Sequence, residues 1–320
     1  MLAHSEKMSA EGRIRTCELL REQILSLSPL TRLGNFGLSL SNRMPLIKII
    51  EELEQDTYYF KEITDNPPTM SEEEKVGNQF EGKEKYVKDV FEDIAPYYDK
   101  MNGIMSMGMV KRWHKFMFKK AGNIKGFYVA DIGCGTGEIT FMASERVGAE
   151  GKVKGIDLTP GMLEIAKIKM EERNLPDNIE FEVGDCLDMK YDDNTFDLVT
   201  TGYMLRNVTD IPKAVEEMYR VLKPGHKIII AELAKPKNRI LRFGYNIYVF
   251  RIIPWYGRHF DKGKVIDGKM PAYDWLTSSL EGFPHGADMV KILKEKGFSD
   301  ARFYSKSFGA VNIYVGTKSQ

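Results

Sequence analysis

From residue 127 onward, short apolar runs alternate with longer segments in which apolar residues recur every three or four positions. Apolar runs bounded by turn residues predict buried strands, and the three-to-four-residue repeat predicts helices. Alternation of the two is typical of a parallel sheet with helical crossovers. The predicted strands are 127–132, 152–157, 178–184, 196–203 and 227–233, and the predicted helices are 137–147, 160–173 and 212–222.

The two ends of the chain follow different patterns. Residues 301–318 alternate apolar and polar positions around Gly309, which predicts an antiparallel hairpin completing a seven-stranded, mostly parallel sheet. We therefore expect an α/β, Rossmann-like domain over residues 86–320. Residues 1–85 form a predicted N-terminal extension, partly helical, that ends in a polar linker containing Pro67 and Pro68. This extension is either a mobile arm or a segment that binds a partner or a membrane surface.

Composition narrows the functional classes. The 46 basic and 46 acidic residues cancel, which gives no global electrostatic basis for nucleic-acid binding. Three cysteines without C-x-x-C spacing argue against a disulfide framework or a zinc site, so we expect a reducing compartment and no metal. No apolar run approaches the roughly 20 residues that a membrane-spanning helix needs. Any membrane contact is therefore expected to be peripheral.

The N-terminal residues also bear on location. Glu6, Glu11, Glu18 and Glu22 depart from the acid-poor composition of an organelle transit peptide. We therefore expect a cytoplasmic protein, with or without membrane association, in preference to one of the mitochondrial matrix.

The strongest chemical signal lies where the first predicted strand ends, at Asp131, Gly133, Gly135, Thr136 and Gly137. Glycines permit positive φ angles and close approach of the backbone to a ligand, and the helix that follows offers free N–H donors. The G-x-G-x-G spacing differs from the dinucleotide pattern G-x-G-x-x-G. A carboxylate before the glycines would repel a pyrophosphate and suits the cationic methionine end of S-adenosylmethionine. The motif therefore indicates S-adenosylmethionine as cofactor.

Other strand ends carry residues suited to the same cofactor. Asp157, followed by Leu158, comes about 20 residues after the glycines, where a carboxylate can accept both ribose hydroxyls. Asp185 and Cys186 follow the third strand and are placed to meet the adenine edge. Gly202, at the end of the fourth strand, completes the predicted cofactor contacts. Open α/β sheets bind ligands at the carboxyl ends of their strands, so these residues predict one shared site.

Longer motifs resemble the ubiquinone/menaquinone C-methyltransferase family. They are YDKMN at 98–102, LRNVTD at 205–210 and RVLKPG at 220–225, within a likeness that runs from about Val87 to Lys318. The resemblance implies a class I methyltransferase fold, S-adenosylmethionine as cofactor and a lipophilic prenylated quinol as substrate. It implies methylation of a ring carbon, with demethylmenaquinol, in the last step of menaquinone biosynthesis, favoured over a benzoquinol of ubiquinone biosynthesis.

The same resemblance suggests catalytic residues. Arg206 is the candidate to stabilise developing phenolate charge; the alternative is an arginine that ties the loop to a carboxylate. Asn207 could orient a quinol oxygen or cap the loop. Tyr98 and Asp99 are interpreted as lid residues near the methionine end of the cofactor and the substrate; the alternative for Asp99 is a helix-terminal charge. Tyr203 is a candidate contact for the substrate ring.

Three departures from the family pattern leave other functions open. Val110 replaces a histidine, His226 a glycine and Ala234 a serine. They motivate a second hypothesis, methylation of another lipophilic molecule. A third hypothesis is a non-catalytic, cofactor-binding scaffold in a quinone-biosynthesis assembly, against which the intact Asp131 and Asp157 argue. A homodimer is a further open expectation.

An aromatic segment at 241–256 is the last feature of note. Core packing is its ordinary explanation. The functional interpretation is a channel for a polyprenyl tail, with Trp255 and Arg258 as interfacial anchors.

Overall fold

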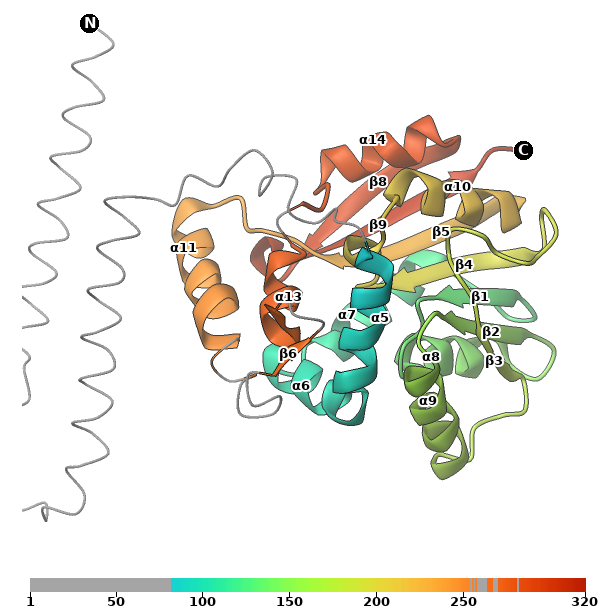
Figure 1. The fold of residues 1–320 in the computed structure, drawn as a ribbon. Helices are drawn as coiled ribbons and strands as arrows, with labels where there is room; N and C mark the ends of the chain where they lie inside the picture. The colour runs from blue at the N-terminus through green and yellow to red at the C-terminus, as the bar shows by residue number, and fades with distance from the viewer. Residues whose placement is uncertain (1–81, 254, 256, 258–263, 267–269, 281) are drawn as a thin grey trace, which may run out of the picture. The chain divides into compact units, whose positions relative to one another are not determined.

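The computed structural model describes residues 82–253, 255, 257, 264–266, 270–280 and 282–320 (Figure 1). The predicted extension, apart from its last four residues, and Arg258 lie outside these ranges. Among the described helices, none combines the length and the apolar character needed to cross a membrane.

A seven-stranded sheet organises the described residues, in the order β3-β2-β1-β4-β5-β9-β8. The first five strands pair in parallel, whereas β9 is antiparallel to both of its neighbours, β5 and β8. The predicted α/β sheet with a C-terminal antiparallel hairpin is thus confirmed. The strands are β1 (Tyr128–Ile132), β2 (Lys152–Asp157), β3 (Ile179–Val183), β4 (Phe196–Gly202), β5 (Leu222–Leu233), β8 (Phe298–Lys306) and β9 (Val311–Lys318).

Strand β5 begins earlier than predicted, at Leu222 instead of residue 227. Phe196 pairs with Leu222, but Leu198 pairs with Lys227, so the intervening residues 223–226 leave the ladder. Residues 223–226, which lie between the predicted helix and the predicted strand, therefore form a bulge inside the strand, because the chain returns to register after them.

Alternate side chains of each strand fill two apolar layers. On β5, Ile228 and Ile230 lie in the layer with α10 (Ile211–Val221) and α14 (Ala287–Glu295). Ile229 and Ala231 lie in the opposite layer, with α7 (Val110–Ala121) and α8 (Glu138–Val147). Helix α9 (Pro160–Glu172) contacts β2 and β3. A strand covered on both faces requires a continuous apolar run, which is the pattern the sequence shows.

Helices α5 (Lys83–Ile94) and α6 (Tyr98–Met105) pack with α13 (Ala272–Ser278) around Tyr86 and Trp275 (Figure 1). These two rings meet edge-on, with centroids 5.3 Å apart. The buried Lys83 ammonium donates a 2.8 Å hydrogen bond to the carbonyl of Val208, in the loop after β4. Burial lowers the pKa of Lys83 to about 8. Helix α5 begins three residues before the predicted domain start at residue 86, and the exact domain limits stay a prediction.

The remaining described elements connect β5 to the C-terminal hairpin. They are α11 (Arg239–Ile247), the π-helical turn η5 (Tyr248–Ile252), and the short strands β6 (Val265–Ile266) and β7 (Met270–Pro271). Short 3-10 turns occur at η3 (Ala95–Tyr97), η4 (Leu205–Asn207) and η6 (Ser307–Gly309). The turn η4 matters most for function, because it contains the arginine and asparagine of the predicted site.

Candidate active site

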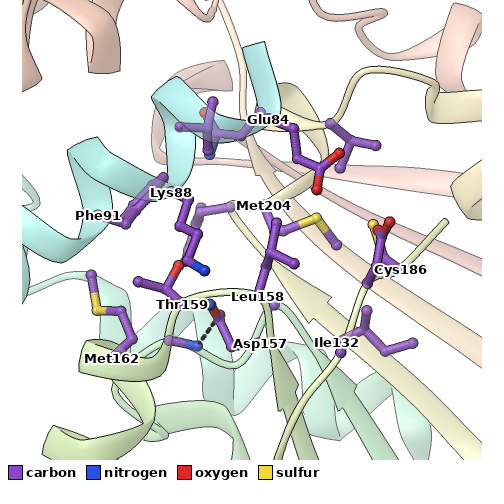
Figure 2. A pocket seen from close by; sticks show the side chains of 18 of the residues that line it. Glu84, Lys88, Phe91, Ile132, Asp157, Leu158, Thr159, Met162, Cys186 and Met204 are labelled. Atoms are coloured by element: carbon purple, nitrogen blue, oxygen red, sulfur yellow. Dashed lines mark hydrogen bonds between the residues drawn. The ribbon is translucent and has the colours of Figure 1, made fainter. Parts of the chain in front are cut away.

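A cavity of about 840 Å³ lies where β1, β2 and β4 end. Strand-end loops form one side, and Glu84, Lys88 and Phe91 of α5 face it from the other (Figure 2). This main cavity is therefore a candidate binding site, at the sheet edge where open α/β folds bind ligands.

The glycine loop approaches the cavity through Gly133 and Gly135, with φ angles of +66° and +53°. A Cβ on Gly133 would lie 2.3 Å from Cγ of Met204, so a side chain there is excluded by packing as well as by backbone conformation. At Gly135 the nearest atom would be on the Tyr98 ring, 4.0 Å away. The space beside Gly135 is therefore open for a ligand to lie against the backbone.

Asp157 ends β2 and lines the cavity. One carboxylate oxygen accepts a hydrogen bond from Gly135 N–H (2.8 Å) and the other accepts from Thr159 N–H (2.9 Å). Burial raises the pKa of Asp157, against the lowering effect of these bonds. A carboxylate has about four acceptor sites, so Asp157 is held in place and can still accept a hydroxyl group. This geometry fits the predicted ribose contact.

Asp131, in contrast, does not line the cavity. Its fully buried carboxylate accepts hydrogen bonds from the hydroxyls of Thr140 (2.7 Å) and Thr200 (2.9 Å). Burial raises the pKa of Asp131 to about 7, and the two hydroxyls offset only part of this rise. Asp131 therefore joins β1 to α8 and β4.

Thr136 and Asp99 meet at the edge of the site. The Thr136 hydroxyl donates to Oδ1 of Asp99 (2.6 Å), and Lys169 Nζ donates to Oδ2 of Asp99 (2.7 Å) and to the Thr136 carbonyl (2.9 Å). Neither Thr136 nor Gly137, which precedes α8, lines the cavity. The Asp99 carboxylate thus joins α6 to the glycine loop, as a lid residue would.

The other predicted cofactor contacts, Leu158, Asp185, Cys186 and Gly202, all line the cavity. Asp185 Oδ1 accepts a 2.8 Å hydrogen bond from the N–H of Leu187, which fixes the loop after β3. Burial raises the pKa of Cys186 to about 12, so its thiol stays protonated at neutral pH. Together these residues give one end of the cavity an apolar wall beside a single carboxylate, a surface suited to a flat heterocycle.

Tyr98 and Asn207 also line the cavity. Burial raises the pKa of Tyr98, so it is a neutral phenol. Oδ1 of Asn207 accepts a 3.2 Å hydrogen bond from the Trp275 indole N–H. Within the described part of the chain, the Asn207 Nδ2 group has no acceptor in hydrogen-bonding range. The hydrogen bond to Oδ1 therefore orients the amide, and Nδ2 can donate to a ligand.

Arg206 does not line the cavity. Its buried guanidinium donates from Nη1 to Glu232 Oε1 (2.7 Å) and to the Tyr203 carbonyl (2.5 Å), and from Nε to the Ser279 hydroxyl (3.2 Å). The structure therefore shows the carboxylate tie that was the alternative interpretation. Sequence reasoning missed Glu232, because partners 26 positions apart leave no local signal.

Tyr203 lines the cavity with an unusual backbone, φ +61°. Its hydroxyl is buried and finds no hydrogen-bond partner among the described residues, and the same holds for Nε2 of His114. The two ring centroids are 6.0 Å apart. Burial raises the pKa of Tyr203 and lowers that of His114 to about 4, so both groups are neutral. Buried polar atoms are nearly always paired, so this pair indicates space for a ligand or water.

The three departures from the family pattern lie away from the cavity lining. Val110 begins α7 and packs at the edge of the apolar layer. His226 lies 3.6 Å from Asp197, and Ala234 is buried where its N–H donates to the carbonyl of Ala310. None of the three therefore shapes the main cavity directly.

Helix α5 was the main omission of the sequence analysis. Glu84, Val87, Lys88 and Phe91 line the cavity, although Glu84 falls within the predicted extension. Their spacing is that of one helical face, which was the available signal. Because α5 lies far from the glycine motif in sequence, nothing in the sequence indicated that this helical face covers the cavity.

The fit to S-adenosylmethionine follows from these contacts. The cavity offers a contact for each part of a nucleoside cofactor. The backbone at Gly135 leaves room for the ligand, the oriented Asp157 carboxylate can accept the ribose hydroxyls, and the apolar surface around Cys186 suits the adenine. Fold and cavity together define a class I S-adenosylmethionine-dependent methyltransferase.

The chain belongs to the ubiE/COQ5 methyltransferase family, whose model matches residues 79–318. It is 36% identical to a demethylmenaquinone methyltransferase of Symbiobacterium thermophilum, over 74% of this chain and 94% of that one. It is 34% identical to a ubiquinone/menaquinone biosynthesis C-methyltransferase of Idiomarina loihiensis, over 74% and 92% of the two chains. The family resemblance and the class of enzyme are thereby confirmed.

A solved structure supports the fold. A Methanococcus maripaludis protein described as an S-adenosyl-L-methionine-dependent methyltransferase superposes with a TM-score of 0.50 at 20% identity. The match covers 71% of this chain and 92% of the other.

The buried Asp131 predicts a specific pH dependence of stability. The pKa of this carboxyl is about 4 in the unfolded chain and about 7 in the folded protein. As the pH rises from about 4 to about 7, the free energy of unfolding therefore falls by about 1.4 kcal/mol per pH unit. Asp131→Asn removes this titration. Urea unfolding of both proteins from pH 5 to 7 should show the variant gaining stability relative to wild type as pH rises. Parallel curves would mean that Asp131 titrates normally.

Asp157→Asn is expected to weaken cofactor binding by roughly 10- to 100-fold, because hydrogen bonds to a charged group contribute about 1.5–3 kcal/mol. Titration calorimetry with S-adenosylhomocysteine measures this directly. Asp188→Asn, a change of an exposed carboxylate outside the cavity lining, is the matched control and should bind like wild type. Equal affinities for both variants would remove Asp157 from the site.

Proposed function

We propose that the protein transfers a methyl group from S-adenosylmethionine to a ring carbon of a prenylated quinol, demethylmenaquinol in the first instance. The observation that carries this proposal is the family membership, with relatives at 34–36% identity that are named as demethylmenaquinone methyltransferases. The cavity supports it, because Val87 and Phe91 of α5 give an apolar surface opposite the strand-end residues.

The reaction needs a nucleophilic carbon held in line with the methyl group, about 3 Å away. The bound cofactor supplies an electrophilic methyl group. The acceptor is positioned by the Asn207 amide, and the Tyr203 hydroxyl is a second donor for a quinol oxygen. Both groups are fixed before the acceptor binds, which lowers the reorganisation needed in the transition state.

Arg206 contributes through its position. A guanidinium stays protonated in proteins, so Arg206 does not act as a general base. Held by Glu232, Ser279 and the Tyr203 carbonyl, it places a fixed positive charge behind the residues that contact the acceptor. A preorganised charge of this kind stabilises negative charge that develops on a quinol oxygen as the ring carbon is methylated.

A second candidate acceptor is a benzoquinol of ubiquinone biosynthesis, because the Idiomarina loihiensis relative is named for both pathways. Another lipophilic acceptor and a non-catalytic scaffold are the remaining alternatives. All three predict the same cofactor contacts and differ in which molecule becomes methylated.

The test is transfer of a labelled methyl group from S-adenosylmethionine to reduced demethylmenaquinol and to an unmethylated benzoquinol analogue. We expect the naphthoquinol to be labelled faster. Labelling of neither quinol by a protein that binds S-adenosylhomocysteine would contradict the proposal.

Two variants separate the structural and catalytic roles of Arg206. Arg206→Met alone leaves Glu232 buried and unpaired, which should destabilise the fold by about 3–5 kcal/mol. The double variant Arg206→Met/Glu232→Leu should recover most of that stability. If the arginine stabilises the phenolate, the double variant should still lose roughly 100- to 1,000-fold in kcat. Near-normal kcat in a stable double variant would make the ion pair purely structural.

Tyr203→Phe tests the acceptor contact. Removing a buried, unpaired hydroxyl should leave thermal stability unchanged or slightly higher. If the hydroxyl binds a quinol oxygen, KM for the quinol should rise about tenfold, the equivalent of one hydrogen bond. The affinity for S-adenosylhomocysteine should stay the same. An unchanged KM would show that the hydroxyl does not contact the acceptor.

A further inference from the structure

Helix α11 exposes an apolar face to solvent. Ile240 is 82% exposed and Phe243 is 63% exposed, and the half-buried Ile247 continues the same face one turn further on. The i, i+3, i+7 spacing aligns the three side chains on one side of the helix. No residue of α11 is buried, although the helix is strongly amphipathic.

The opposite face already holds the helix to the domain. Tyr245 packs with Tyr248, Val249 and Leu280 in a separate apolar cluster. The Tyr248 hydroxyl donates a 3.0 Å hydrogen bond to the carbonyl of Met105. In Figure 1, α11 stands beside α13, away from the sheet. The exposed face is therefore not needed for packing within the described residues, and clusters of exposed apolar side chains commonly mark interaction sites.

The charge around this face has one sign. Lys237 and Arg239 are exposed at the start of α11, and Arg242 is exposed within it. Between Glu232 and Asp261 the sequence contains no acidic residue. In addition, Trp255 is 60% exposed. A short helix with an apolar face, flanking cations and a nearby tryptophan is typical of a helix lying in the interface of a membrane that contains anionic lipids.

We propose that the outer face of α11, defined by Ile240, Phe243 and Ile247 with the flanking Lys237 and Arg239, docks onto an anionic lipid bilayer. The apolar side chains enter the interfacial region, and the cations pair with lipid phosphates. Docking accounts for the positive charge, which a purely apolar contact with a second protein copy would not require. This inference does not depend on the acceptor, because membrane binding is measured without it.

The experiment is flotation of the full chain with vesicles of phosphatidylcholine alone and of phosphatidylcholine with 30% phosphatidylglycerol, at low and at high salt. We expect binding to the anionic vesicles that weakens with salt. Ile240→Ser/Phe243→Ser should reduce that binding at least about tenfold. Lys237→Glu/Arg239→Glu should abolish the preference for the anionic lipid.

A control variant changes two other exposed apolar positions, Ile168→Ser/Val265→Ser, and should bind vesicles like wild type. Folding of each variant is checked by its affinity for S-adenosylhomocysteine. Trp255 gives an independent readout, because Trp113 and Trp275 are buried: its emission should shift to the blue when anionic vesicles are added.

Three results would overturn the inference. One is wild-type protein that binds neither kind of vesicle. Another is binding that Ile240→Ser/Phe243→Ser leaves intact, which would point to residues 1–81. The third is a protein dimer that the same variant dissociates, which would identify a second copy as the occupant of this face.

Discussion

The buried ion pair between Arg206 and Glu232 connects the parts of the structure that form the site. Arg206 follows β4 and Glu232 lies near the end of β5, and the same guanidinium reaches Ser279 beside α13. Two charges removed from water are stable only when both are paired and hydrogen-bonded, so this loop has little freedom to rearrange. Asn207 and Tyr203, which line the cavity, are its immediate neighbours. The geometry of the acceptor side therefore depends on a contact that no acceptor touches.

The cofactor side is organised differently, by two carboxylates with separate tasks. Asp157 points to the cavity and is held by two backbone N–H groups, whereas Asp131 is sealed between two threonine hydroxyls. Both are buried, and burial raises the pKa of each. Only Asp157 combines an accessible position with spare lone pairs. Asp157 is thus placed for ligand recognition, whereas Asp131 stabilises the packing of the sheet.

The sequence was sufficient for the sheet because central strands such as β5 are covered on both faces and contain apolar runs, whereas the C-terminal hairpin alternates apolar and polar positions. Strand-end residues such as Asp157 and Cys186 were predictable for the same reason, since topology alone brings parallel strand ends together. Contacts between distant segments were not predictable. The partner of Arg206, the α5 side chains over the cavity and the exposed face of α11 depend on how helices dock, which periodicity does not reveal.

The hydrogen bonds of Asp99 have a consequence for turnover. Asp99 joins α6 to Thr136 and Lys169, and Lys83 joins α5 to the loop after β4. Both helices contribute to the wall of the cavity, so breaking such polar contacts would widen it. We therefore expect release of the spent cofactor to depend on how often these contacts open. In an enzyme with such a cover, cofactor exchange is slower, and the reactive sulfonium is better protected from water.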